Sequence, residues 1–194
     1  MDLVIGTPIH GGHFAGRIRV NDVIFGLVVA PREAGQISAT PWITGRKKDV
    51  VGARSYFDGL ANTQAMAAAG SKLAEWALDL RIGDCADWYI PSRDELELLY
   101  RAFKPTTQGN YTWRSGDNPS SVPAGYPYES QAPAQTALEA FREGGAEAFT
   151  PDWYWASTQG SEGDAWDQSF HLGGQYLSGK SWKAFARAVR RFPL

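Results

Sequence analysis

The chain has 194 residues, of which 43% are hydrophobic and 21% are charged, so it is large and apolar enough for one domain with its own core, and disorder is excluded. Its formal net charge at pH 7 is -2, which gives no electrostatic attraction to nucleic acid or to anionic membrane surfaces. No run of eighteen apolar residues and no basic-plus-apolar leader occurs, so we expect neither membrane insertion nor a signal peptide. We therefore treat residues 1–194 as a single domain made in the cytoplasm.

Residue types that commonly catalyse reactions or bind metals are scarce. Cys85 is the only cysteine, so no internal disulfide can form, and Asp84 and Asp87 flank it with negative charge that disfavours a reactive thiolate. His10 and His13 are spaced like a pair of metal ligands, but no nearby carboxylate or thiol completes a site. We expect no catalytic residue, no metal and no cofactor.

The first half of the chain predicts a hairpin and a helix. Apolar stretches at 18–20 and 23–30 flank Asn21 and Asp22, a pair that tolerates the positive φ of a tight hairpin turn. From 62 to 80, apolar residues recur every three or four positions, which predicts one amphipathic helix that ends before Gly83.

A second main helix is predicted to begin at Arg93. Ser92 and Glu95 have the spacing of a capping box, in which the two side chains satisfy free backbone N–H groups at the start of a helix. Pro105 ends this helix because proline neither donates a hydrogen bond nor fits inside one. The face expected to be buried carries Leu96, Leu99 and Phe103.

The carboxylates of this helix are expected to have a structural role only. Asp94, Glu95 and Glu97 fall on its polar side, where they would serve as cap and solvated face.

A long loop is predicted to follow. Residues 105–133 contain five prolines together with glycine, serine and asparagine, which is typical of irregular backbone, and loops of this length are often functional. A short helix over 134–143 is expected next, with Leu138 and Phe141 inward and Gly144 as its end. The order of elements, without βαβ alternation, predicts an α+β fold with two main helices, antiparallel strands and long irregular loops.

The C-terminal region, 153–192, is predicted to form strands that bind a ligand. Large apolar side chains alternate there with small or hydrogen-bonding ones, as in strands that bury one face and display the other. Aromatic residues mixed with serine and glycine are also typical of protein contact surfaces. The competing interpretation is a core role, which we favour for Trp166, Phe170, Phe185 and Val189. For Tyr176, Trp182 and Lys183 both interpretations stay open.

Several segments resemble a known family. Asp87–Leu96, Trp153–Thr158, Ala165–Phe170 and Arg187–Phe192 are similar to the C-type-lectin-fold domain at the C-termini of collagen-like bacterial adhesins and in phage tail proteins. Residues 11–18 and 58–63 resemble the phage branch in particular. The resemblance covers nearly the whole chain and implies a C-type-lectin-like fold.

Within that branch, the C-terminal strands resemble the variable region of diversity-generating retroelement target proteins. The resemblance implies fixed residues at Trp166, Gln168, Phe170, Gly173, Gln175 and Arg190. It implies an exposed, changeable, ligand-binding set at Asp167, Ser169, His171, Leu172, Gly174, Tyr176, Leu177, Ser178, Ser181, Trp182, Lys183 and Ala184.

The leading hypothesis is a receptor-binding protein of a phage or prophage tail tip or tail fibre that recognises a bacterial surface receptor, either protein or glycan. A virion protein is assembled in the host cytoplasm and needs no signal peptide. Other tail subunits and further copies of the chain, most favourably in a trimer, are the expected partners because such fibres gain avidity from several sites.

Two alternatives remain. One is a bacterial adhesin or scaffold module that binds glycan or protein. The more remote one is a relative of the formylglycine-generating enzymes, which share the fold but need paired cysteines, whereas this chain has one. The triplets with which many sugar-binding lectins hold calcium are also missing, so calcium, although possible in this fold, would lack its usual ligands.

Overall fold

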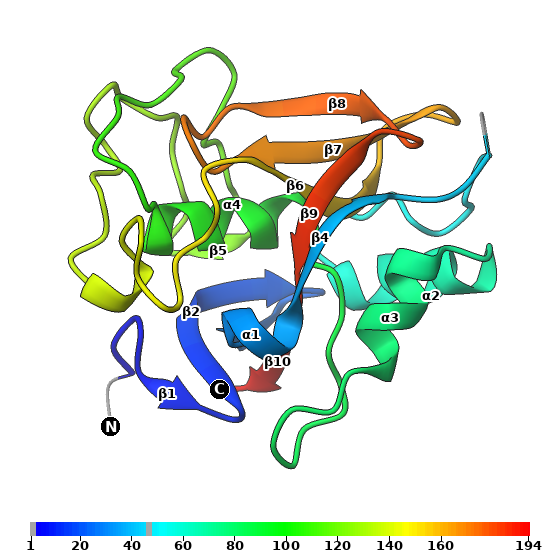
Figure 1. Ribbon diagram of the computed structural model, residues 1–194, viewed down its shortest axis with the longest axis horizontal. Coiled ribbons are helices and arrows are strands. Elements are labelled where there is room, and N and C mark those ends of the chain that lie inside the picture. Colours follow the sequence, from blue (N-terminus) through cyan, green and yellow to red (C-terminus); the bar gives the residue numbers. More distant parts are fainter. Residues whose placement is uncertain (1–2, 46–47) are drawn as a thin grey trace.

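The computed structural model describes residues 3–45 and 48–194, which fold into two sheets with helices between and beside them (Figure 1). All strand pairs are antiparallel except the parallel pair β6 and β9. The first sheet has the order β1 (Pro8–Ile9), β2 (Gly12–Val20), β3 (Val23–Val29) and β10 (Val189–Pro193), with β5 (Ser121–Val122) paired to β2. The second sheet has the order β4 (Gln36–Pro41), β9 (Lys183–Arg187), β6 (Trp153–Gln159), β7 (Asp164–Ser169) and β8 (Gln175–Gly179). The expected α+β class is confirmed.

The helices occupy different positions relative to the two sheets. They are α1 (Arg32–Gly35), α2 (Gly59–Ala68), α3 (Lys72–Asp79), α4 (Arg93–Phe103) and a 3-10 turn, η1 (Glu139–Phe141). Helix α4 lies between the two sheets and packs on β2, β6 and β7, whereas α2 and α3 lie to one side, with α2 against β6 (Figure 1). None of these helices, in the part of the chain that is described, has the length and apolarity needed to cross a membrane.

The predicted hairpin is confirmed. Strands β2 and β3 pair up to Val20 and Val23, and the two turn residues have φ of 49° at Asn21 and 65° at Asp22. Positive φ at both central positions matches the right-handed twist of the strands, so the local sequence is sufficient to specify this turn.

The predicted helix over 62–80 is wrong in extent. The structure has two helices there, because Gly70 adopts a φ of 90° and the Ser71 side chain accepts a hydrogen bond from Ala74 N at the start of α3. A left-handed glycine followed by a serine cap ends one helix and begins another, even though the apolar residues keep their helical spacing.

The capped helix is confirmed as α4. It begins at Arg93 with both hydrogen bonds of the capping box, and it ends two residues before Pro105. Leu96, Leu99 and Phe103 are buried as expected.

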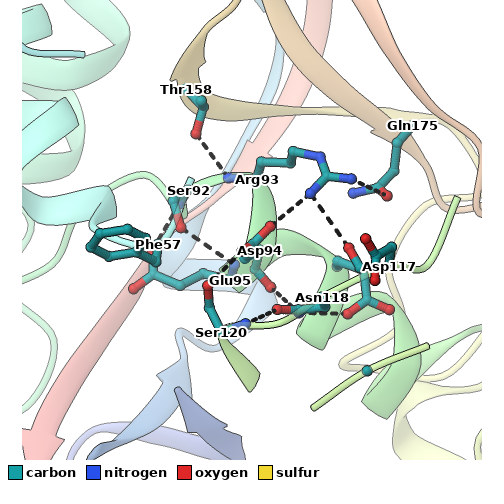
Figure 2. A network of polar contacts seen from close by, with 12 residues as sticks. Phe57, Ser92, Arg93, Asp94, Glu95, Asp117, Asn118, Ser120, Thr158 and Gln175 are labelled. Carbon is teal, nitrogen blue, oxygen red and sulfur yellow. Dashed lines mark hydrogen bonds and ion pairs between the residues drawn. The ribbon is translucent and has the colours of Figure 1, made fainter. Parts of the chain in front are cut away.

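The prediction of a solvated acidic face on α4 is wrong. Asp94, Glu95 and Glu97 are all buried, and burial raises the pKa of each carboxyl while hydrogen-bonded partners oppose the rise. The loop that follows α4 folds back over this face and supplies some of the partners. Ser120 Oγ donates to Asp94 at 2.7 Å (Figure 2). Asn118 Nδ2 donates to Glu97 at 2.6 Å.

The region after α4 is irregular, as predicted for 105–133, and contains only the short strand β5. The helix predicted over 134–143 is wrong, because only η1 forms. Thr136 explains the difference: its N–H donates to Lys104 O at 3.0 Å and its hydroxyl accepts from Leu138 N at 3.3 Å. These bonds hold the segment in a non-helical path, in which Phe141 is buried and Leu138 is half-buried.

Candidate ligand-binding site

Strand β8, which carries much of the predicted binding region, is fixed to the start of α4. The side-chain oxygen of Gln175 accepts from Arg93 Nη2 at 3.4 Å and from Gly116 N at 3.3 Å (Figure 2). The Arg93 guanidinium carbon lies 5.2 Å from the ring centroid of Tyr56 and 5.0 Å from that of Trp166, and the backbone N–H of Arg93 donates to Thr158 at 2.9 Å. The start of the helix is therefore joined to the strand through a guanidinium that two aromatic rings help to hold in place.

A pocket of about 610 Å³ opens beside this strand, and we name it the β8 pocket. Four aromatic side chains from separate segments form its walls: Tyr111, Trp153, Tyr176 and Trp182. The rings of Trp153 and Tyr176 meet edge to face at 5.6 Å, and those of Tyr111 and Tyr176 lie 5.7 Å apart. Its size and its partly aromatic lining are those of a small-molecule or side-chain binding site.

The structure brings most of the predicted ligand-binding residues together at this pocket. His171, Ser181 and Lys183 are exposed but lie outside its lining. Those that line it are Asp167, Ser169, Leu172, Gly174, Tyr176, Leu177, Ser178 and Trp182.

The expectation that every member of this set is exposed is wrong. Ala184 is 2% exposed and belongs to the core between α2, α3 and the second sheet. Asp167, Ser169 and Gly174 are also buried, although they line the pocket. In register on the neighbouring strands, Trp153 lies opposite Ser169 and Tyr176 lies opposite Asp167, so large aromatic side chains share this face of β7 and cover its smaller polar ones.

Gly174 is needed for the pocket's shape. A Cβ atom at this position would lie 2.8 Å from Tyr176 Cε2 and 3.4 Å from Tyr111 Cδ1. Because glycine has no side chain, both tyrosine rings can pack close to the backbone at this position.

The sequence did not reveal Tyr111 and Trp153 as pocket residues. Tyr111 comes from the irregular loop and is held by its N–H, which donates to Leu172 O at 2.7 Å. No periodicity could have revealed that long-range contact. Trp153 could have been found, because it pairs with Ser169 across β6 and β7 and so shares a face with a predicted site residue.

The residues expected to be fixed make internal contacts. Phe170 is fully buried and stacks on Phe149 at 4.1 Å, and Gln168 Nε2 donates to Tyr128 Oη at 3.0 Å. Gly173 has a φ of 80° and leaves no room for a side chain beside the ring of Tyr100. Arg190 forms two hydrogen bonds with Asp87.

Lys180 anchors the turn that presents Trp182. Its ammonium donates to Lys48 O at 2.8 Å and to Glu162 O at 3.0 Å and lies 4.7 Å from the ring of Trp42. Burial lowers the pKa of Lys180 to about 8, while Asp49 opposes the shift. The turn is therefore tied to the protein by a lysine with several partners, although Trp182 itself remains 59% exposed.

Asp167 is the unusual polar group of the β8 pocket. It is 2% exposed, and neither carboxylate oxygen has a hydrogen-bond partner that meets ordinary geometry. Burial raises the pKa of Asp167 to about 7, and the Ser178 hydroxyl opposes that rise only in part. A buried carboxylate without a partner is costly for the free protein.

Asp167 is expected to make the protein more stable as the pH falls toward 5. Its pKa is about 7 in the folded protein and near 3.8 without burial, so the folded state takes up a proton first and the free energy of unfolding rises as pH falls through 7. The full shift corresponds to at most about 4 kcal/mol, of which about 1–2 kcal/mol should appear between about pH 8 and about pH 5.5.

Urea unfolding of the parent and of Asp167→Asn at both pH values measures this contribution. The variant should lack this part of the rise and should be the more stable protein at about pH 8. Asp94, Glu95 and Glu97 titrate in both proteins, so the difference isolates Asp167. Equal pH dependence in the two proteins would contradict the assignment.

The described residues hold no group of three or more histidine, cysteine or acidic side chains placed to bind a metal. His10 instead packs on Phe192 at 4.7 Å and His13 on Phe141 at 5.3 Å. The fold and the site together define an α+β fold with an aromatic-walled, ligand-sized pocket at the edge of its second sheet.

Comparison with known proteins does not assign a family. No family model and no curated protein matches the sequence. Among solved structures, the chain is similar to a fimbrial protein from Bacteroides ovatus ATCC 8483, with a TM-score of 0.39 and 14% identity. The match covers 84% of this chain and 35% of that one, so this chain spans about a third of its length. At this TM-score the likeness defines neither a shared fold nor a shared function.

Proposed function

We propose that this chain is a ligand-binding domain of C-type-lectin-like fold that serves as the receptor-binding protein of a phage or prophage tail. The observation that carries the proposal is the β8 pocket, which gathers eight of the twelve residues that the family resemblance marks as ligand-binding. Three of the four aromatic side chains that form its walls, Tyr111, Tyr176 and Trp182, are exposed, and aromatic side chains are among the residue types that dominate binding energy at protein surfaces.

The C-type-lectin-like fold is supported by features the resemblance implies. Antiparallel strands predominate in both sheets, α4 packs between the sheets, and a long irregular loop follows that helix. The first and last parts of the chain also meet, because β10 pairs with β3 over Val189–Pro193. Such a frame fixes the backbone of β7 and β8 while leaving the side chains at the pocket free to differ.

The biological role follows from the resemblance and from the pocket together. The ligand is a bacterial surface receptor, and the protein acts at the tail tip or fibre of the virion beside other tail subunits. A trimer would present three β8 pockets and multiply a weak single-site affinity through avidity.

Replacing Tyr176 and Trp182 together with alanine is expected to weaken cell binding at least about 30-fold, or about 2 kcal/mol, because each ring is a contact anchor. Thermal stability should change little, since the two side chains are 38% and 59% exposed. Labelled parent protein is first screened by flow cytometry on a panel of bacterial strains, and the variant is then titrated on the strains that bind.

The matched control is the double change Trp113→Ala and Tyr126→Ala. These aromatic side chains are also strongly exposed, at 59% and 63%, but lie outside the β8 pocket. The control variant should bind like the parent. Full binding by the Tyr176 and Trp182 variant, or equal loss in the control, would show that receptor recognition does not use this pocket.

A further inference from the structure

The β8 pocket combines aromatic walls with a buried acid, Asp167, that has no charged partner among the described residues. Asp167 pairs in register with Trp155 on β6 and with Tyr176 on β8, so its strand neighbours on both sides are aromatic. The exposed ring of Trp182 and the loop residue Tyr111 complete the surroundings.

Other buried acidic side chains in this protein accept hydrogen bonds from well-placed donors. Asp94 accepts from Ser120 and Arg93, Glu95 from Tyr89 and two backbone N–H groups, and Glu97 from Asn118 and Arg101. Asp167 takes part in no ion pair among the described residues, and no charged neighbour shifts its pKa. Asp94, Glu95 and Glu97 therefore accept hydrogen bonds from several donors, whereas Asp167, at the pocket, has no charged partner.

We propose that the β8 pocket binds an organic cation, an ammonium or guanidinium group, which pairs with the Asp167 carboxylate and lies against the surrounding aromatic rings. This proposal rests on the proposed function and specifies the chemistry of the receptor group that enters the pocket. A cation interacts favourably with the faces of tryptophan and tyrosine rings within about 6 Å. It also supplies the positive charge that Asp167 lacks, and a cation that carries N–H groups can donate hydrogen bonds as well.

A neutral ligand such as a sugar fits these observations less well. The apolar C–H face of a sugar would stack on the rings and its hydroxyls would donate to the carboxylate, but the negative charge would stay buried without compensation. A cation removes this uncompensated charge.

Binding of the cation should depend on pH through Asp167. The groups beside it are Ser178 and Tyr176 from β8, Trp155 from β6, and Tyr111 from the loop, and none of them is an acidic residue, a lysine, an arginine or a histidine. The Tyr111 hydroxyl raises the pKa of Tyr176 to about 12, so this phenol stays neutral. Since the pKa of Asp167 is about 7, acidification protonates the carboxylate and removes the partner of the cation.

Choline tests the proposal against 3,3-dimethylbutan-1-ol, which has the same shape but no charge. Titrations of the purified chain, followed by NMR signals of the tryptophan indoles, should show choline binding at the pocket at least about tenfold more tightly than the alcohol. The choline affinity should fall about 30-fold from about pH 8 to about pH 5.5.

Asp167→Asn should reduce choline affinity at least about tenfold. Asp84→Asn, the same chemical change at an exposed residue away from the pocket, should leave it unchanged. Equal binding of choline and the neutral alcohol to the parent protein would overturn the proposal without relying on any variant, and so would tighter binding of N-acetylglucosamine with no response to Asp167→Asn.

These results are separate from the test of the proposed function. Loss of cation selectivity with intact dependence of cell binding on Tyr176 and Trp182 would reject only the ligand chemistry. Cell binding that is unchanged when both rings are replaced would reject the receptor-binding role, regardless of the result with choline.

Discussion

Glu95→Ala is expected to lower the free energy of unfolding by about 3–5 kcal/mol. In a chain of this length, that corresponds to a fall of about 6–20 °C in Tm. The side chain is fully buried and joins three segments. It accepts from Tyr89 Oη at 2.7 Å, from Ser92 N at 2.8 Å and from Gly59 N at 3.1 Å.

The size of the effect follows from the donors that alanine would leave unpaired. Each buried donor without an acceptor costs about 1–3 kcal/mol. Burial raises the pKa of Glu95, so the folded protein disfavours the charged form of this side chain. Removal of the buried charge therefore offsets part of the loss.

Glu95→Gln is the matched control, and its loss should stay below about 1.5 kcal/mol. The amide oxygen can still accept from Ser92 and Gly59, and the amide N–H can donate to the Tyr89 oxygen. Urea unfolding of the three proteins at neutral pH provides the comparison. An alanine variant as stable as the glutamine variant would show that the hydrogen bonds to Glu95 contribute little.

Local sequence was sufficient where the determining residues lie next to one another. The turn at Asn21 and Asp22 and the capping box of Ser92 and Glu95 depend on contacts within four residues, and both predictions are confirmed. The end of α2 at Gly70 depended equally on local chemistry. The apolar spacing continues across Gly70 and Ser71, so periodicity alone does not mark this break.

Tertiary contacts decided what local patterns could not. The acidic side of α4 has the sequence of a solvated face, but Asn118 and Ser120, more than twenty residues later, cover it. Thr136 bonds back to Lys104 and prevents the short helix that the sequence favours. In each case the partner comes from an irregular loop, whose path no periodic pattern describes.

The candidate site was predictable only in part for the same reason. The family resemblance placed the C-terminal strands at a binding surface, and the β8 pocket contains most of the residues it marked. It gave no indication that Tyr111 crosses from the long loop to close one wall, or that Asp167 is buried without a partner. Both facts follow from strand register and loop packing.

Arg187→Met is expected to destabilise the protein by about 3–5 kcal/mol. Arg187 is fully buried where the chain passes from β9 in the second sheet to β10 in the first. Its Nε donates to Ala30 O at 2.9 Å and its Nη1 to Glu147 O at 2.7 Å, and it forms an ion pair with the Glu147 carboxylate. The guanidinium also lies 4.8 Å from the ring of Phe149.

Methionine fills similar volume but donates no hydrogen bond, so the carbonyl oxygens of Ala30 and Glu147 would be left without this donor. Burial lowers the pKa of Arg187 to about 10, with Glu147 opposing the shift, so the side chain is charged at neutral pH. The loss should therefore be present throughout the neutral range. The substitution should also weaken the junction between the two sheets. At this junction β9, the strand that follows Trp182, leads into β10.

Arg190→Met provides the contrast three residues along the chain. Its partner Asp87 is exposed, with 52% of its side chain accessible, and ion pairs with an exposed partner contribute about 0–1 kcal/mol. Urea unfolding at neutral pH should therefore show a large loss for Arg187→Met and a small one for Arg190→Met. Similar small losses for both would mean that apolar packing of methionine compensates for the buried ion pair, and that the junction between the sheets does not depend on the charge of Arg187.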